Sequence, residues 1–73
     1  MDQAAPNQVK NLRASRLWTQ AQLARKAKIS RRTVGRVEAL TWEPSILVQE
    51  KLARAFGLPR DIIFPGLPEE AVS

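Results

Sequence analysis

Apolar residues recur at roughly helical spacing along the chain, and capping residues divide them into short segments. The first segment, residues 7–17, carries apolar side chains at Val9, Leu12 and Leu17, with basic residues between them. No Gly or Pro interrupts it, and Pro6 stands where proline suits a helix start. These features predict a first helix over residues 7–17.

The second predicted helix begins after Thr19, whose hydroxyl can cap the backbone N–H groups of the first turn. Gln22 follows three residues later, as in a capping box, where two side chains satisfy each other's backbone donors. The helix then spans residues 20–27. Its expected inner face consists of three small or apolar residues: Leu23, Ala24 and Ala27.

Ser30 is the next capping residue, and the third predicted helix spans about residues 31–40. Val34 and Val37 are expected to face inward. Gly35 weakens such a helix by up to about 1 kcal/mol relative to Ala. Its presence therefore requires a reason, such as close packing or the close approach of a ligand.

The C-terminal part of the chain contains one longer apolar helix and one short helix. Ser45 caps a predicted helix over residues 46–56, and Gly57 is a favourable residue for ending it. Residues 59–64 are predicted to form a short fifth helix, and residues 65–73 a tail. The expected core positions of this part are Val48, Leu52, Ala53, Phe56 and either Ile63 or Phe64.

The length of 73 residues allows one domain at most, with an arm at 1–6, a helical domain at 7–64 and the tail at 65–73. Cys is absent, which excludes disulfides and thiolate metal sites, and the absence of His removes the commonest general base. We therefore expect no catalytic site, no cofactor and no metal. No signal peptide is visible, and no apolar run approaches the ~20 residues of a membrane helix. These features predict a cytoplasmic protein without membrane contact.

The net charge of +5 is unevenly distributed. Residues 3–37 contain no acidic residue and nine basic ones, whereas residues 38–73 contain six acidic and three basic ones. This asymmetry favours a partner with dense negative charge, and the phosphates of nucleic acid are the leading candidate. On charge alone, a solvated basic surface is an equally good interpretation.

The second and third predicted helices are short and are separated only by Lys28, Ile29 and Ser30. So short a connection requires the two helices to cross at a large angle, as in a helix-turn-helix. The stretch WTQAQLARKAKISRRTVGRVE, residues 18–38, resembles the helix-turn-helix of the Xre family, the Cro and phage-repressor type of regulator. With LARAFGLPRDIIF further on, the resemblance extends over about residues 9–64. The positions that fit the family pattern are Thr19, Gln20, Leu23, Ala24, Ile29, Ser30, Arg31, Thr33, Val34, Arg36, Val37 and Glu38.

The resemblance implies an all-α, compact five-helix lambda-repressor-like domain that binds double-stranded operator DNA as a two-fold homodimer. It implies base contacts from the third helix, at Arg31, Arg32 and Arg36. Thr33 is a further candidate for a base contact, and an equally good interpretation is that it only stabilises the helix start. It implies a phosphate contact from Gln20, and we expect further phosphate contacts from Ser30, Lys28, Arg16 and Thr41. Arg13 and Glu38 match a family pair that forms a salt bridge between the first helix and the end of the third. On this basis Glu38→Gln is expected to weaken DNA binding more than folding.

The chemistry of the third helix agrees with this resemblance. Arginine presents two donors that match guanine O6 and N7. Arg31 and Arg32 stand at the positive end of the helix dipole, an unfavourable placement that a DNA contact would explain. Lys28 and Leu40 depart from the family, because glycine is usual at both positions. A left-handed backbone at Lys28 would cost about 1 kcal/mol.

We expect a sequence-specific regulator, and more narrowly a repressor, but two alternatives stay open. An antitoxin would bind a toxin through the tail that begins at Pro65 and would repress its own operon. A helical adaptor would bind protein and show no salt-dependent affinity for DNA. Trp18 is expected in the core, and Trp42, Leu47 and Ile62 or Ile63 are candidates for a self-association patch.

Overall fold

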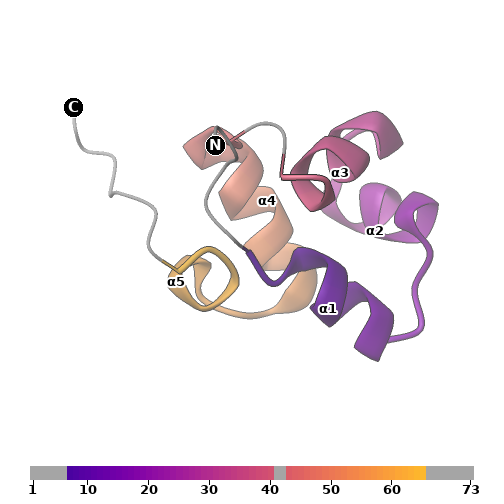
Figure 1. Cartoon of the computed structure of the whole chain (residues 1–73), viewed down its shortest axis with the longest axis horizontal. Coiled ribbons are helices and arrows are strands. Elements are labelled where there is room, and N and C mark those ends of the chain that lie inside the picture. Colours follow the sequence, from indigo (N-terminus) through magenta and orange to yellow (C-terminus); the bar gives the residue numbers. More distant parts are fainter. Residues whose placement is uncertain (1–6, 41–42, 66–73) are drawn as a thin grey trace.

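The computed structural model describes residues 7–40 and 43–65, and no strand occurs among them. The helices follow in the order α1 (Val9–Ser15), α2 (Gln20–Ala27), α3 (Arg31–Glu38), α4 (Ile46–Phe56) and α5 (Arg60–Ile63). Figure 1 shows α4 between α5 on one side and the α2–α3 pair on the other. The predicted all-α class with five helices is confirmed. The predicted arm, Thr41, Trp42 and residues 66–73 of the tail lie outside the described residues.

Side-chain caps determine where three of the helices begin. Thr19 Oγ1 accepts a hydrogen bond from the backbone N–H of Gln22 at 3.0 Å, and Gln22 Oε1 accepts one from the N–H of Thr19 at 2.8 Å. The predicted capping box is therefore present. Ser30 and Ser45 cap α3 and α4, each accepting from the N–H three residues further on. These bonds satisfy donors that the first helical turn leaves unpaired.

The first three helices are each followed by a left-handed residue that is not glycine. The φ angle is +59° at Leu17, +61° at Lys28 and +58° at Leu40, whereas α4 ends at Gly57 with a φ of +72°. The prediction that α1 includes Leu17 was therefore wrong. The backbone has already turned there, and the Leu17 side chain is 89% exposed. Lys28 and Leu40 adopt the backbone region in which glycine has no steric penalty.

The third and fifth helices are shorter than predicted. Ala39 closes α3 at the end of Arg31–Glu38, and the positive φ of Leu40 takes the chain out of the helical path. The extended backbone of Pro59, with a ψ of 150°, delays the start of α5. Phe64, with a φ of −122° and a ψ of 67°, ends it after one turn.

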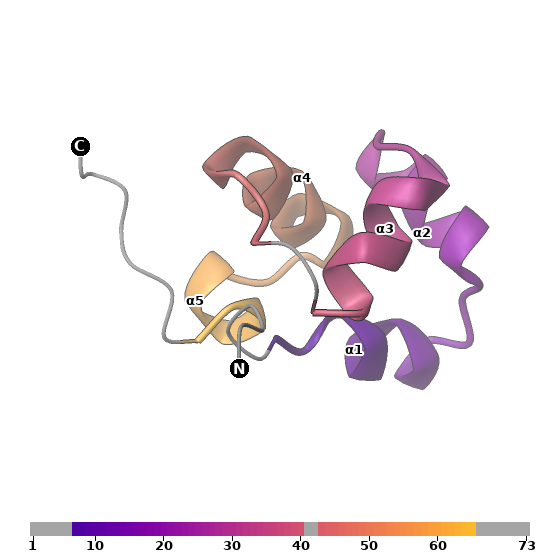
Figure 2. The same cartoon turned by 45° about the horizontal axis from the view of Figure 1, so that its top comes forward.

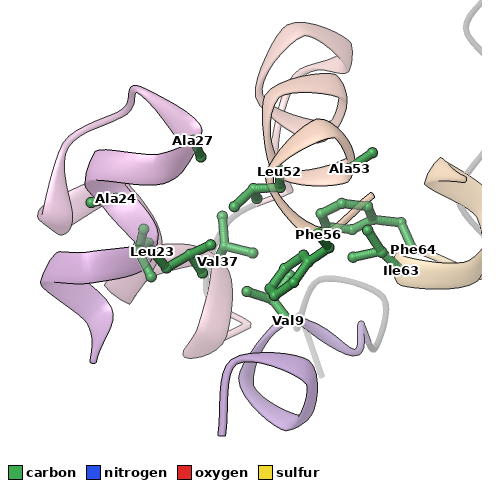
Figure 3. Packing of buried hydrophobic residues seen from close by; sticks show 11 residues of the cluster. Val9, Leu23, Ala24, Ala27, Val37, Leu52, Ala53, Phe56, Ile63 and Phe64 are labelled. Atoms are coloured by element: carbon green, nitrogen blue, oxygen red, sulfur yellow. The ribbon is translucent and has the colours of Figure 1, made fainter. Parts of the chain in front are cut away.

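One cluster of buried apolar side chains joins the helices. Figure 3 shows them directed toward one another between the helices. Its members are Val9, Leu23, Ala24, Ala27, Val34, Val37, Leu52, Ala53, Phe56, Ile63 and Phe64. The predicted inner faces are confirmed, except that Val48 is only partly buried, and Ile63 and Phe64 are both buried. Trp18 packs against the cluster and stacks on Phe56, with 5.6 Å between ring centroids.

Two hydrogen bonds connect the start of α1 to distant helices. The backbone N–H of Gln8 donates to the carbonyl of Ile63 at 2.8 Å, and Asn7 Nδ2 donates to the carbonyl of Val37 at 3.1 Å. In Figure 2, α3 lies beside α2, and α1 passes below both. The first three helices lie together on one side of the molecule, and α4 and α5 lie on the other. Within the described ranges, no helix has the length and apolar character needed to cross a membrane.

Candidate nucleic-acid interface

The outward side of α3 carries the three arginines predicted to contact bases. Arg31, Arg32 and Arg36 are exposed, whereas Val34 and Val37 are buried. Successive residues of a helix are about 100° apart, so Arg32 and Arg36 lie about 40° apart around the axis. Arg31 is about 100° from Arg32. The first turn of α3 contains no acidic residue, so the charge presented there is entirely positive.

Ser30 and Thr33 bond to each other at the start of α3. Ser30 Oγ accepts from the backbone N–H of Thr33 at 3.0 Å, and the two hydroxyl oxygens are 2.8 Å apart. Thr33 is half-buried, whereas Ser30 is exposed. The pair stabilises the first turn of the helix. Because each hydroxyl oxygen has two acceptor sites, a DNA contact stays a prediction for both residues.

Glu38 connects α1, α2 and α3. Arg13 Nε and Nη2 donate to Oε2 and Oε1 of Glu38 at 2.6 and 3.1 Å, and Gln20 Nε2 donates to Oε1 at 2.9 Å. The Arg13 and Glu38 side chains are only 16% and 5% exposed. The hydrogen bond from Arg13 to Glu38 raises the pKa of Arg13 above its ordinary value, so the guanidinium keeps its charge. We call these three residues the Glu38 network.

The burial of Glu38 changes what its replacement is expected to do. Removing one partner of an enclosed ion pair leaves the other charge uncompensated, which is strongly destabilising. Replacement of Glu38 should therefore weaken folding as well. That Glu38→Gln weakens DNA binding more than folding stays a prediction.

Gln20 and Lys28 stand at opposite ends of α2. The bond from Gln20 to Glu38 holds the Gln20 side chain but leaves its second amide hydrogen and its oxygen for another partner. Lys28 is exposed at the turn into α3. Phosphate contacts by the two residues stay predictions, at two separate places along α2.

Arg16 packs on aromatic rings. Its guanidinium carbon lies 5.4 Å from the ring centroid of Trp18 and 5.2 Å from that of Phe56. Lys26 Nζ lies 4.9 Å from the Trp18 ring. Cation–π attraction therefore holds Arg16 against the C-terminal end of α4, whereas Arg31, Arg32 and Arg36 lie on α3. A phosphate contact by Arg16 stays a prediction. The guanidinium would have to bind the phosphate while it remains packed on the Trp18 and Phe56 rings.

A surface hollow of about 400 Å³ lies beside the Glu38 network, between α1, α2 and α3. Its lining consists of Lys10, Arg13, Gln20, Gly35, Glu38 and Ala39. Lys10 was not among the residues predicted to contact DNA. Lys10 and Arg13 are three residues apart on α1 and therefore share one side of that helix, which is the pattern that could have identified Lys10.

Two large apolar side chains are exposed on α4 and α5. Leu47 is 59% exposed and Ile62 is 53% exposed. Ile63 is buried, so only Ile62 of the two predicted alternatives can contribute to a self-association patch. In the described ranges, no group of three or more acidic residues is arranged to hold a metal ion.

Comparison with known proteins places these features in a family. The sequence pattern of the helix-turn-helix family matches residues 9–63, from the start of α1 to the end of α5. The chain is similar to a crystal structure of a hypothetical transcription factor, NHTF, from Neisseria, with 30% sequence identity and a TM-score of 0.71. The similarity covers 82% of this chain and 67% of that chain. None of the curated proteins compared with the chain matches it. The chain belongs to the Xre and Cro type of helix-turn-helix family, whose members are DNA-binding regulators of transcription.

Proposed function

We propose that the protein is a sequence-specific repressor that places α3 in the major groove of operator DNA. The observation that carries this proposal is the exposure of Arg31, Arg32 and Arg36 along one helix whose other side is buried. The major groove, about 12 Å wide, admits a helix. An arginine there can donate two hydrogen bonds to O6 and N7 of guanine, the commonest base-specific contact.

The positions of Arg31 and Arg32 support this function. Both are in the first turn of α3, where the helix dipole disfavours cations by about 0.3–1 kcal/mol each. The Ser30 cap stabilises the turn but does not offset their charge. The same turn would reach the base edges in a helix-turn-helix complex. A placement unfavourable to the isolated protein is explained if phosphates and guanines supply the negative partners.

A homodimer would place two copies of α3 about 34 Å apart on a two-fold operator. The exposed Leu47 and Ile62 supply apolar surface that a second copy would cover. Repression would then follow from occupation of the operator by both copies. Sedimentation of the free protein and of its DNA complex would test the dimer. A single copy in both states would contradict it.

Selection of bound duplexes from a random library tests the function directly. We expect enrichment of a two-fold sequence with guanines in each half-site. Arg31→Ala should weaken binding to that sequence by about 1–3 kcal/mol and relax the preference at one base pair. Arg54→Ala, on the exposed side of α4, is the matched control and should bind as the wild type does. Absence of any enriched sequence at low salt would overturn the proposal.

An antitoxin would share this DNA binding and add a toxin as partner. The observation that favours a protein partner is again the exposure of Leu47 and Ile62. Co-purification of one toxin protein in stoichiometric amount, without DNA, would favour the antitoxin. A DNA-binding homodimer alone would favour the simple repressor.

A further inference from the structure

Leu17 presents an apolar side chain to the solvent at a turn that does not require one. Its φ of +59° lies in the left-handed region, where glycine avoids the steric penalty that leucine incurs. The side chain is 89% exposed, more than any other large apolar side chain that the structure describes. Hydrogen bonds to the backbone close the turn, from the Leu17 N–H to the carbonyl of Ala14 at 3.0 Å and from Arg13 Nη1 to the carbonyl of Trp18 at 2.8 Å. Neither backbone geometry nor burial in the domain explains this leucine.

Two cations share the ring of Trp18, the residue that follows Leu17. The guanidinium carbon of Arg16 and Nζ of Lys26 lie 5.4 and 4.9 Å from the ring centroid, and both side chains are exposed. Residues 3–37 contain no acidic residue, and neither cation forms an ion pair with any residue that the structure describes. Cation–π attraction brings the two groups to one ring although their like charges repel. A carboxylate beside them would relieve this repulsion.

The Trp18 ring fixes this arrangement against the core. It stacks on Phe56 with 5.6 Å between the centroids, and the guanidinium carbon of Arg16 lies 5.2 Å from the Phe56 centroid. Figure 1 and Figure 2 both show the connection between α1 and α2 at the end of the molecule opposite α5, the helix that carries the exposed Ile62. We call this separate group of side chains the Leu17 surface, and its members are Arg16, Leu17, Trp18 and Lys26.

We propose that the Leu17 surface docks an acidic segment of another protein, in which carboxylates flank an apolar side chain. The apolar side chain covers Leu17, and the carboxylates bind Arg16 and Lys26 by charge-assisted hydrogen bonds. Charge complementarity selects such a partner, because the members of the surface include two cations and no anion. The docking goes beyond the proposed DNA binding, for which the arginines of α3 are used.

A membrane and a DNA duplex fit the Leu17 surface less well than an acidic protein segment. Even a single myristoyl chain binds a membrane only marginally, so one exposed leucine cannot anchor the domain to lipid. DNA phosphates would pair with the cations of the surface but leave the leucine exposed, because phosphate contacts are made by charged and hydrogen-bonding groups. Only a partner that is both acidic and apolar uses the leucine and the cations together.

A short synthetic peptide of alternating aspartate and leucine is the probe for this surface. A two-dimensional NMR titration of the full chain reports where the peptide binds. We expect shifts of the backbone signals of residues 16–18 and 26 and of the Trp18 indole N–H, with the signals of α3 unchanged. A peptide with glycine in place of leucine should bind at least ~10-fold more weakly, because it cannot bury an apolar side chain. A peptide with lysine in place of aspartate should not bind.

Leu17→Gly separates docking from folding. It should raise the melting temperature by about 4–8 °C, because glycine avoids the left-handed penalty. It should also weaken peptide binding at least ~10-fold and leave the affinity for operator DNA unchanged. Arg16→Gln should weaken peptide binding by about 2–5-fold. Arg54→Gln, the same change at an exposed position of α4, is the matched control and should leave peptide binding unchanged.

Four outcomes would overturn the docking surface. The first is wild-type peptide affinity in Leu17→Gly, and the second is a set of peptide-induced shifts confined to α3. The third is binding to vesicles of anionic lipid without binding to the peptide, which would indicate a membrane. The fourth is peptide binding that appears only after Glu69→Gln and Glu70→Gln are combined. It would assign the surface to the chain's own tail, in which Leu67 stands near these two acids.

Discussion

Two helix ends in this protein have nearly the same backbone and different residues. α2 ends in the sequence LARKAKI (residues 23–29) and α4 in the sequence LARAFGL (residues 52–58). Lys28 and Gly57 have φ angles of +61° and +72°, and the N–H of each donates to the carbonyls three and four residues earlier. The residues that follow them, Ile29 and Leu58, each bond to the carbonyl five residues earlier, at 3.0 and 3.1 Å, and pack against the core.

The difference is that α2 has a lysine where α4 has a glycine. A side chain in the left-handed region costs about 1–2 kcal/mol, and glycine avoids that cost. The turn after α4 leads into α5, whose Ile63 is buried, whereas the turn after α2 leads into the arginines of α3. Because Gly57 forms the same turn after α4, the backbone of the turn after α2 does not require a lysine. We infer that Lys28 is present for its charge, next to the proposed DNA surface.

The largest difference in stability between helices α1–α3 and helices α4–α5 should come from the Glu38 network. Helices α4 and α5 contain no comparable described ion pair. Glu38→Ala leaves Arg13 without its partner and should lower the free energy of unfolding by about 3–5 kcal/mol. Urea unfolding followed by circular dichroism measures this change. Glu50→Ala, exposed on α4, is the control and should change it by less than about 0.5 kcal/mol. Equal midpoints for the two variants would show that the network is dispensable.

The two equivalent leucines should behave alike. Leu23 and Leu52 begin the matching sequences, and both are completely buried. Leu23→Ala and Leu52→Ala should each lower the free energy of unfolding by about 3 kcal/mol, through lost burial and the cavity left behind. The same urea experiment compares them. A loss of unfolding free energy several times larger for one variant would mean that the two leucines do not contribute equally to the stability of the core.

Exchanging the residues at the two turns should have opposite effects of about 1 kcal/mol. Lys28→Gly should raise the free energy of unfolding, and Gly57→Lys should lower it, because only glycine avoids the left-handed penalty. For a domain of this size the melting temperature should move by about 4–8 °C in each direction. A lower melting temperature for Lys28→Gly would show that the lysine side chain stabilises the turn.

The smallest effect concerns DNA. Lys28→Asn keeps a residue that tolerates the left-handed backbone and removes the charge. If Lys28 contacts a phosphate, the slope of log K against log salt should fall by about 0.9, and operator and unrelated duplexes should lose affinity equally. Gly57→Asn is the matched control at the other turn. An unchanged salt slope in Lys28→Asn would remove Lys28 from the proposed contacts.

Local features of the helices could be predicted because they depend on residues close together in the chain. The Thr19 capping box and the caps at Ser30 and Ser45 join residues three apart. The prediction that α1 extends to Leu17 was wrong because it depended on the same local pattern. Leu17 lies four residues after Arg13 and five after Leu12, so it fits a helical pattern only roughly, and no side chain indicates that the backbone turns there. Hydrophobic periodicity records which residue types occur and not the φ angle that each adopts.

The sequence alone determined where the helices form, which faces are buried and where positive charge accumulates, because periodicity, capping and charge act over a few residues. The tertiary structure decided which distant side chains meet. Glu38 lies 18 residues from Gln20 and 25 from Arg13, and only the packing of three helices closes that network and opens the hollow beside it. Packing also placed Arg16 over Phe56, at the end of α4. Such contacts depend on how whole helices are oriented, which no short stretch of residues specifies.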